Sequence, residues 1–150
     1  MTAVTLIRGK ATLTMAGLRA KPATPRDGFR VSAQSPFLGI ETLAQQSPVP
    51  LMACAVLAGF AVECALKSYL VTSFVSARAL KKRYGHNLSK LWRTAVRYGL
   101  PIAKRPPAWC IALNRLTTGP AFFARYHTGV HGLRFPSTSR MVRGIRKLLT

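Results

Sequence analysis

The stretch LMACAVLAGFAVECALKSYLVTSFV, residues Leu51 to Val75, decides the fold. It contains no proline, only Gly59 as a weak helix former, and many Ala, Leu and Met residues, which favours a helix. Its first half is apolar on every side, so the helix is either enclosed by neighbours or begins a membrane span. Glu63 and Lys67 interrupt the apolar run at i, i+4 spacing, where they can pair with each other. The sequence therefore predicts a central buried helix.

The composition is strongly basic. The chain has 150 residues, enough for one domain with its own core, and carries 23 Lys and Arg against three acids, for a formal charge of +20. Such an excess raises the local concentration of polyanions and strengthens attachment to nucleic acid or anionic surfaces. An arginine-rich composition without a polyanion partner is the alternative interpretation of the same counts.

The shortage of acids excludes several enzyme classes. From Val49 onward Glu63 is the only acidic residue, whereas two-metal nucleases, glycosidases and P-loop enzymes need several. Neither a Gly-rich Walker loop nor a G-x-S-x-G elbow is present. No cofactor is expected, and no metal either: His127 and His131 have the spacing of a metal pair but lack a helix and a nearby carboxylate.

The cysteines and the N-terminal region indicate a cytoplasmic protein. Cys54, Cys64 and Cys110 are widely spaced, with no C-x-x-C, as is typical of buried thiols in a reducing compartment. No apolar core of a secretory signal follows the N-terminus. Residues 1–48 contain several prolines and no sustained periodicity, which predicts a mostly disordered basic arm. Within it, one short helix is expected at about Pro36 to Gln46.

Residues 49–150 are expected to form a helical bundle. Apolar residues recur at helical spacing, and no stretch alternates long enough to build a sheet. After the central helix, the expected elements are the basic stretch Ser76 to Tyr84, as a continuation or a separate helix stopped by Gly85; a helix with Asn87 as its N-cap and Gly99 and Pro101 at its end; Ala108 to Leu116; a structured loop from Ala121 to Thr138; and a last helix from Ser139. The fold class is all-α, a bundle of four to five helices.

Several short motifs resemble those of the HEPN-like superfamily of small prokaryotic helical proteins, over Pro50 to the C-terminus. That group has an E-x-A-L-K-x-x-L helix, a G-H-x-L start of the next helix, and an R-Y-P-like loop before the last helix. The matching positions are Glu63, Ala65, Leu66, Lys67 and Leu70; Gly85, His86 and Leu88; a Pro-Pro-x-Trp at Pro106, Pro107 and Trp109; and Arg125 with Tyr126, followed by Phe135 and Pro136.

The resemblance implies a homodimeric bundle from a superfamily with metal-independent RNases and non-catalytic members. Many of the latter accompany nucleotidyltransferases in toxin–antitoxin pairs, so RNA or an acidic protein of that kind is the expected partner. The nucleases carry Arg-x(4–6)-His, a spacing that Arg125 and His131 share. His131 would then act as the base, Arg125 as the charge stabiliser and His127 as a second acid. Gly129 and Gly132 instead favour a structural loop.

Other polar residues are interpreted as structural. Glu63 is expected to neutralise Lys67 or Arg125 inside the bundle. His86 is expected to cap or orient the helix that begins after Asn87.

The outward helix faces are the candidate contacts to phosphates, because acids are not interspersed among their cations. Trp92 and Trp109 sit at core spacing, which argues against base stacking. The candidate residues are Lys81, Lys82 and Arg83; Lys90, Arg93 and Arg97; and Arg140, Arg143, Arg146 and Lys147.

Together these observations predict a HEPN-like module without catalysis, associated with nucleic acid or with a toxin–antitoxin partner. The alternative is a metal-independent endoribonuclease that uses Arg125 and His131. A weaker alternative is a membrane-associated helical protein anchored by Leu51 to Val75.

Overall fold

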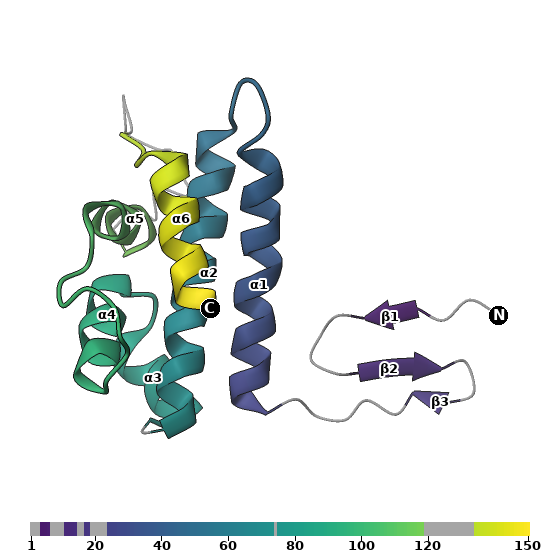
Figure 1. The fold of residues 1–150 in the computed structure, drawn as a ribbon. Coiled ribbons are helices and arrows are strands. Elements are labelled where there is room, and N and C mark those ends of the chain that lie inside the picture. Colours follow the sequence, from purple (N-terminus) through teal and green to yellow (C-terminus); the bar gives the residue numbers. More distant parts are fainter. Residues whose placement is uncertain (1–3, 7–10, 15–16, 19–23, 74, 119–133) are drawn as a thin grey trace.

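The computed structural model describes residues 4–6, 11–14, 17–18, 24–73, 75–118 and 134–150. Within these residues it contains six helices and three short strands (Figure 1). The helices are α1 (Pro25–Leu43), α2 (Leu51–Ser73), α3 (Ala77–Tyr84), α4 (Leu88–Arg97), α5 (Ala108–Thr118) and α6 (Thr138–Leu149). The predicted all-α class is confirmed.

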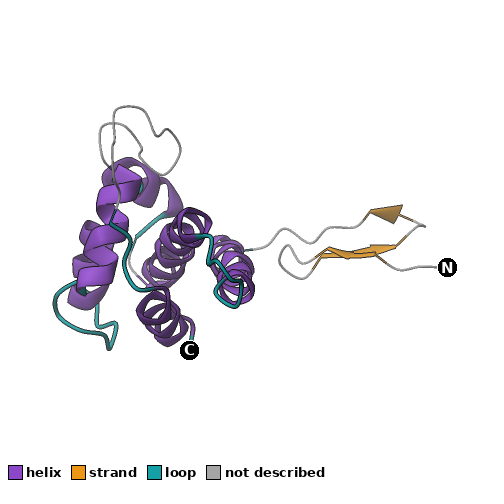
Figure 2. Cartoon of the chain, turned by 90° about the horizontal axis from the view of Figure 1, so that it is seen from above, coloured by secondary structure: helices purple, strands orange, loops and turns teal. Residues whose placement is uncertain are grey.

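The central helix α2 contacts each of the other helices. Figures 1 and 2 show α1 and α6 running alongside it. One stripe of α2 at i, i+4 spacing is completely buried, with an exposed fraction of 0% for Cys54, Ala58, Val62, Leu66 and Leu70. A helix buried in this way needs apolar residues around most of its circumference, as its sequence has. The prediction of an enclosed central helix is confirmed.

The same helix is long and apolar enough to cross a membrane. Leu51–Val71 has a mean hydropathy of 1.7, and it is the one helix of that kind in the described ranges. Within its most apolar window, 61% of the residues are buried inside the bundle. A core helix has the same length and hydropathy, so these features alone do not indicate a membrane span.

Helix α1 begins eleven residues before the short helix expected at Pro36 to Gln46, and it ends at Leu43. Its start has the usual N-terminal chemistry: the Thr24 hydroxyl accepts a hydrogen bond from Asp27 N at 3.2 Å, and Pro25 occupies the first turn. Pro36 lies inside the helix rather than at its start. From residue 25 onward, the predicted disordered arm is therefore mostly part of the bundle.

The N-terminal region also contains a small sheet, contrary to the expectation that no stretch would form one. Strands β1 (Val4–Leu6), β2 (Ala11–Thr14) and β3 (Gly17–Leu18) pair antiparallel in the order β1-β2-β3. Val4 pairs with Leu13, and Leu13 with Leu18. Strands of two to four residues are too short to show a clear alternation in the sequence, which is why they were not predicted.

The helices that follow α2 have the predicted boundaries within one or two residues. Ser76 Oγ accepts a hydrogen bond from Ala79 N at 3.2 Å, so α3 is a separate helix rather than a continuation of α2. Gly85 ends α3 with a φ of 51°, and Asn87 Oδ1 accepts from Lys90 N at 2.8 Å to cap α4. The predicted loop from Ala121 to Thr138 lies outside the described residues up to residue 133.

Helix α6 approaches α5 closely at Gly144. A Cβ atom at this position would lie 2.3 Å from Cζ2 of Trp109, well inside contact distance. Trp109 in turn packs edge-to-face on Trp92, with ring centroids 6.0 Å apart and planes at 80°. Gly144 therefore allows α6 to lie directly on an indole ring, which fixes α6 relative to α4 and α5.

Gly144→Ala is expected to lower the free energy of unfolding by about 1–3 kcal/mol relative to Gly28→Ala. Both substitutions gain helix propensity, but only the methyl group at residue 144 meets an aromatic ring, since a Cβ at residue 28 has nothing within 4 Å. Urea denaturation followed by circular dichroism measures the difference. Equal stability of the two variants would contradict a tight contact between α6 and Trp109.

Candidate nucleic-acid interface

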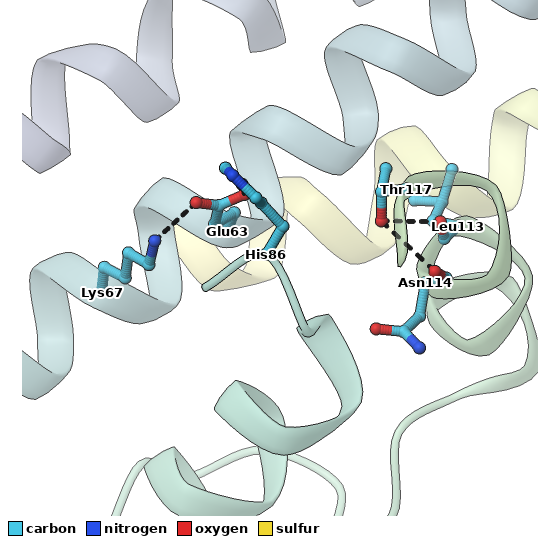
Figure 3. Close-up of polar contacts among 6 residues, drawn as sticks. All are labelled: Glu63, Lys67, His86, Leu113, Asn114 and Thr117. Carbon is cyan, nitrogen blue, oxygen red and sulfur yellow. Dashed lines mark hydrogen bonds and ion pairs between the residues drawn. The ribbon is translucent and has the colours of Figure 1, made fainter. Parts of the chain in front are cut away.

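A buried ionic cluster joins α2 to the start of α4 (Figure 3). Lys67 Nζ donates a hydrogen bond to Glu63 Oε1 at 2.5 Å, and the two side chains are 8% and 9% exposed. The other carboxylate oxygen, Oε2, lies 2.8 Å from His86 Nδ1, whose N–H donates to it. The i, i+4 pair is therefore present, and His86 orients the segment before Asn87 by bonding Glu63.

The cluster accounts for the two motifs that resemble the HEPN-like group. Their lysine and histidine both bond the acid, and their leucines Leu66, Leu70 and Leu88 are fully buried. His86 is 57% exposed, but the carboxylate that it binds is already paired with a buried ammonium. These positions are thus explained by packing and ion pairing, and Arg125, the other predicted partner of Glu63, lies outside the described residues.

The three cysteine thiols of the bundle are buried and have raised pKa values. Burial raises the pKa of Cys64 to about 12, with the nearby Glu63 carboxylate adding to the effect and Lys67 opposing it. Burial alone raises the pKa of Cys110 to about 12. Burial also raises the pKa of Cys54. All three thiols are free and buried, so they are protonated and shielded at neutral pH.

The predicted basic faces are exposed on three helices. Among their residues, Arg146 donates to Glu41 Oε1 at 2.5 Å, and Lys90 donates to the Arg83 carbonyl at 2.8 Å while its Nζ lies 5.2 Å from the Tyr84 ring centre. The α3 face comprises Lys81, Lys82 and Arg83; the α4 face Arg93 and Arg97, beside the engaged Lys90; and the α6 face Arg140, Arg143 and Lys147.

All three carboxylate side chains of the sequence are engaged elsewhere. Glu63 forms ion pairs with Lys67 and His86, and Glu41 forms one with Arg146. Asp27 Oδ2 accepts a hydrogen bond from the Thr24 hydroxyl at 2.7 Å. Within the described ranges, no ion pair involves the α3, α4 or α6 face. These cations are therefore not neutralised by side chains of the same protein.

A groove of about 590 Å³ lies between α6 and the connection from α4 to α5. Trp92 and Trp109 line it, and Trp92 Nε1 donates to the Ala103 carbonyl at 2.8 Å, which holds the connection against α4. The α6 face contributes Arg140, Arg143 and Lys147 along the opposite side. The groove thus combines an apolar, aromatic lining with a row of three cations.

The groove was not predicted from the sequence. Both tryptophans were expected in the core, and Trp92 is indeed buried, but Trp109 is only half-buried and both line the groove. Lys104 and Arg105, which are exposed immediately after Ala103, were not among the predicted contacts either, and they do not line the groove. The A-K-R-P-P run between two helices was the available indication that this connection is basic.

A second groove lies between α1 and α6 and carries less charge. It has a volume of about 420 Å³ and is lined by Phe37, Leu38 and Leu149 among others. Its cation, Arg146, is already paired with Glu41. The groove at Trp92 and Trp109 is therefore better suited to an anionic ligand.

The predicted catalytic residues Arg125, His127 and His131 lie outside the described residues. Among the residues that are described, no group of three or more His, Cys, Asp or Glu side chains is arranged to hold a metal ion. The structure contains one chain, so the predicted homodimer and the acidic partner protein stay predictions.

Comparison with known proteins identifies no relative. No family model, no curated protein and no solved structure matches the chain. The resemblance to the HEPN-like group therefore stays a prediction from the motifs.

Glu63→Gln is expected to lower the free energy of unfolding by about 3–5 kcal/mol, because it leaves the Lys67 ammonium buried without a counter-charge. The matched control is Glu41→Gln, which removes an ion pair to an Arg146 side chain that is 61% exposed and should cost less than about 1 kcal/mol. Chemical denaturation of both variants tests this. Equal losses would mean that the buried pair contributes no more than the surface pair.

The native thiols are expected to react very slowly with an aromatic disulfide reagent at pH 8, and rapidly after unfolding in urea. Folding raises the pKa of Cys64 and Cys110 from 9.0 to about 12, so the native protein holds almost no thiolate at that pH. By the same linkage, their contribution to stability is complete below pH 9.0 and is lost as the pH rises toward 12. Fast labelling of the folded protein at pH 8 would contradict this burial.

Proposed function

We propose that the protein is a HEPN-like, non-catalytic module that binds RNA. The observation that carries the proposal is the set of exposed cations that form the α3, α4 and α6 faces, none of which has a carboxylate partner within the described structure; Arg146, which pairs with Glu41, is not one of them. Phosphate groups of a polyanion are the ligands that complement such a surface.

The electrostatic balance supports a polyanion rather than a small acidic ligand. The formal charge is +20, and the exposed cations extend over three helices instead of converging on one point. A surface of this kind contacts many phosphates at moderate strength each, and it releases a counterion for each contact. RNA is the polyanion favoured by the motifs that resemble the HEPN-like group.

The ionic cluster supports the HEPN-like part of the proposal. Lys67 and His86 come from two separate motifs, and both bond Glu63 in the structure. Their contacts hold α2 and the start of α4 together, which is a structural task. RNA binding is therefore assigned to the exposed helix faces and not to this cluster.

The affinity for RNA is expected to fall steeply with salt. Replacing Arg140, Arg143 and Lys147 together by Gln should reduce the slope of log K against log salt by about two, since each lost phosphate contact on single-stranded RNA contributes roughly 0.7. The control replaces the exposed Arg26, Arg30 and Arg115 by Gln, which lowers the net charge equally away from the three faces. Fluorescence anisotropy with a labelled RNA measures both.

Two results would contradict the proposal in different ways. A wild-type affinity that does not change with salt, or no binding at all, would reject RNA as the partner. Equal slopes for the two triple variants would show that net charge alone attracts RNA and that the α6 face is not an interface.

A further inference from the structure

We infer that the groove between α6 and the α4–α5 connection binds an unpaired base of single-stranded RNA, with the adjacent phosphates on the α6 face. The inference rests on the proposed RNA binding and adds the strandedness of the RNA and the place of one base. It depends on the composition of the groove, which is apolar and aromatic inside and cationic along one side.

The size and lining of the groove fit a nucleobase. Its volume of about 590 Å³ is in the range of small-molecule sites in proteins. Pro101, Ile102 and Pro107 line it together with the half-buried Trp109; Trp92 also borders it but is only 4% exposed. Flat apolar and aromatic surfaces of this kind bind the face or edge of any base, without strong preference for its identity.

The cations of the α6 face lie beside the groove, where they can contact the phosphates of a bound strand. Arg140, Arg143 and Lys147 follow one another at i, i+3 and i+7 on α6, so they form a row on the groove side of the helix. None of them has an ion-pair partner among the described residues. A base inside the groove would therefore bring its flanking phosphates close to a row of unpaired charges.

The groove favours a single strand over a duplex. In double-stranded RNA the bases are stacked and paired, so their faces are not available to an aromatic lining. A single strand can turn one base outward and place it against a protein surface. Duplex RNA would contact the basic faces only, through its phosphates.

A second copy of the chain is the other candidate occupant of this apolar groove. A second copy of the chain carries the same formal charge of +20, and it would have to bring its own surface against three cations. The charge thus opposes a second copy and favours a polyanion.

The intrinsic fluorescence of the protein reports on the groove directly, because Trp92 and Trp109 are the only two tryptophans in the sequence. Titration of the wild-type protein with a short single-stranded RNA is expected to quench this fluorescence, with the same midpoint as binding followed by anisotropy of the labelled RNA. A duplex of the same sequence is expected to bind by anisotropy without the quenching. This readout needs no substitution.

Ala103→Phe fills the groove without changing its charge, and Ala103 is exposed, so the fold should tolerate the change. We expect it to weaken the binding of single-stranded RNA roughly tenfold and to leave duplex binding unchanged, in line with the loss of one stacked base. Ala108→Phe is the matched control, since Ala108 is exposed outside the groove. It should bind both RNAs as the wild type does.

The outcomes separate this inference from the proposed function. If both RNAs bind with salt-dependent affinity, but the duplex quenches equally or Ala103→Phe binds a single strand normally, the groove inference is overturned and RNA binding stands. If neither RNA binds, both fail. If sedimentation shows that Ala103→Phe dissociates a dimer, the groove is a contact between copies, which also overturns the inference.

Discussion

The ion pair between Glu63 and Lys67 is the constraint on which the rest of the bundle depends. Both groups lie in the middle of an otherwise apolar helix that is enclosed by its neighbours, so neither can lose its partner without leaving a charge out of water. The carboxylate also bonds His86, which stands at the entrance to α4. One acidic residue thus neutralises the core and positions the next helix.

Local chemistry made much of the fold predictable. Asn87 and Gly85 have roles that depend only on their neighbours in sequence, and both were identified correctly. Helix α1 was underestimated because Pro36, which usually marks a boundary, lies within it. The better indication was the run Thr24-Pro25-Arg26-Asp27, an N-cap followed by a first-turn proline and an acid.

The cations of the candidate interface could be predicted from the sequence, but its groove could not. Exposed cations can be inferred from helical spacing and from the lack of acids, and those predicted on α3, α4 and α6 are exposed. The groove is formed by residues some forty positions apart, and its shape depends on the contact of Gly144 with Trp109. Spacing within one helix indicates that Trp109 packs toward the core, which it does only in part, and it does not reveal which part of the ring a distant helix leaves uncovered.

The full use of all three carboxylate side chains has a consequence for how the protein responds to ions. Folding gathers the exposed cations onto a small surface, and their mutual repulsion opposes the compact state. Dissolved anions screen this repulsion, and a bound polyanion removes it and adds its own binding free energy to the folded state. Salt therefore has opposite effects on this chain: it raises the free energy of unfolding and lowers the affinity for a polyanion.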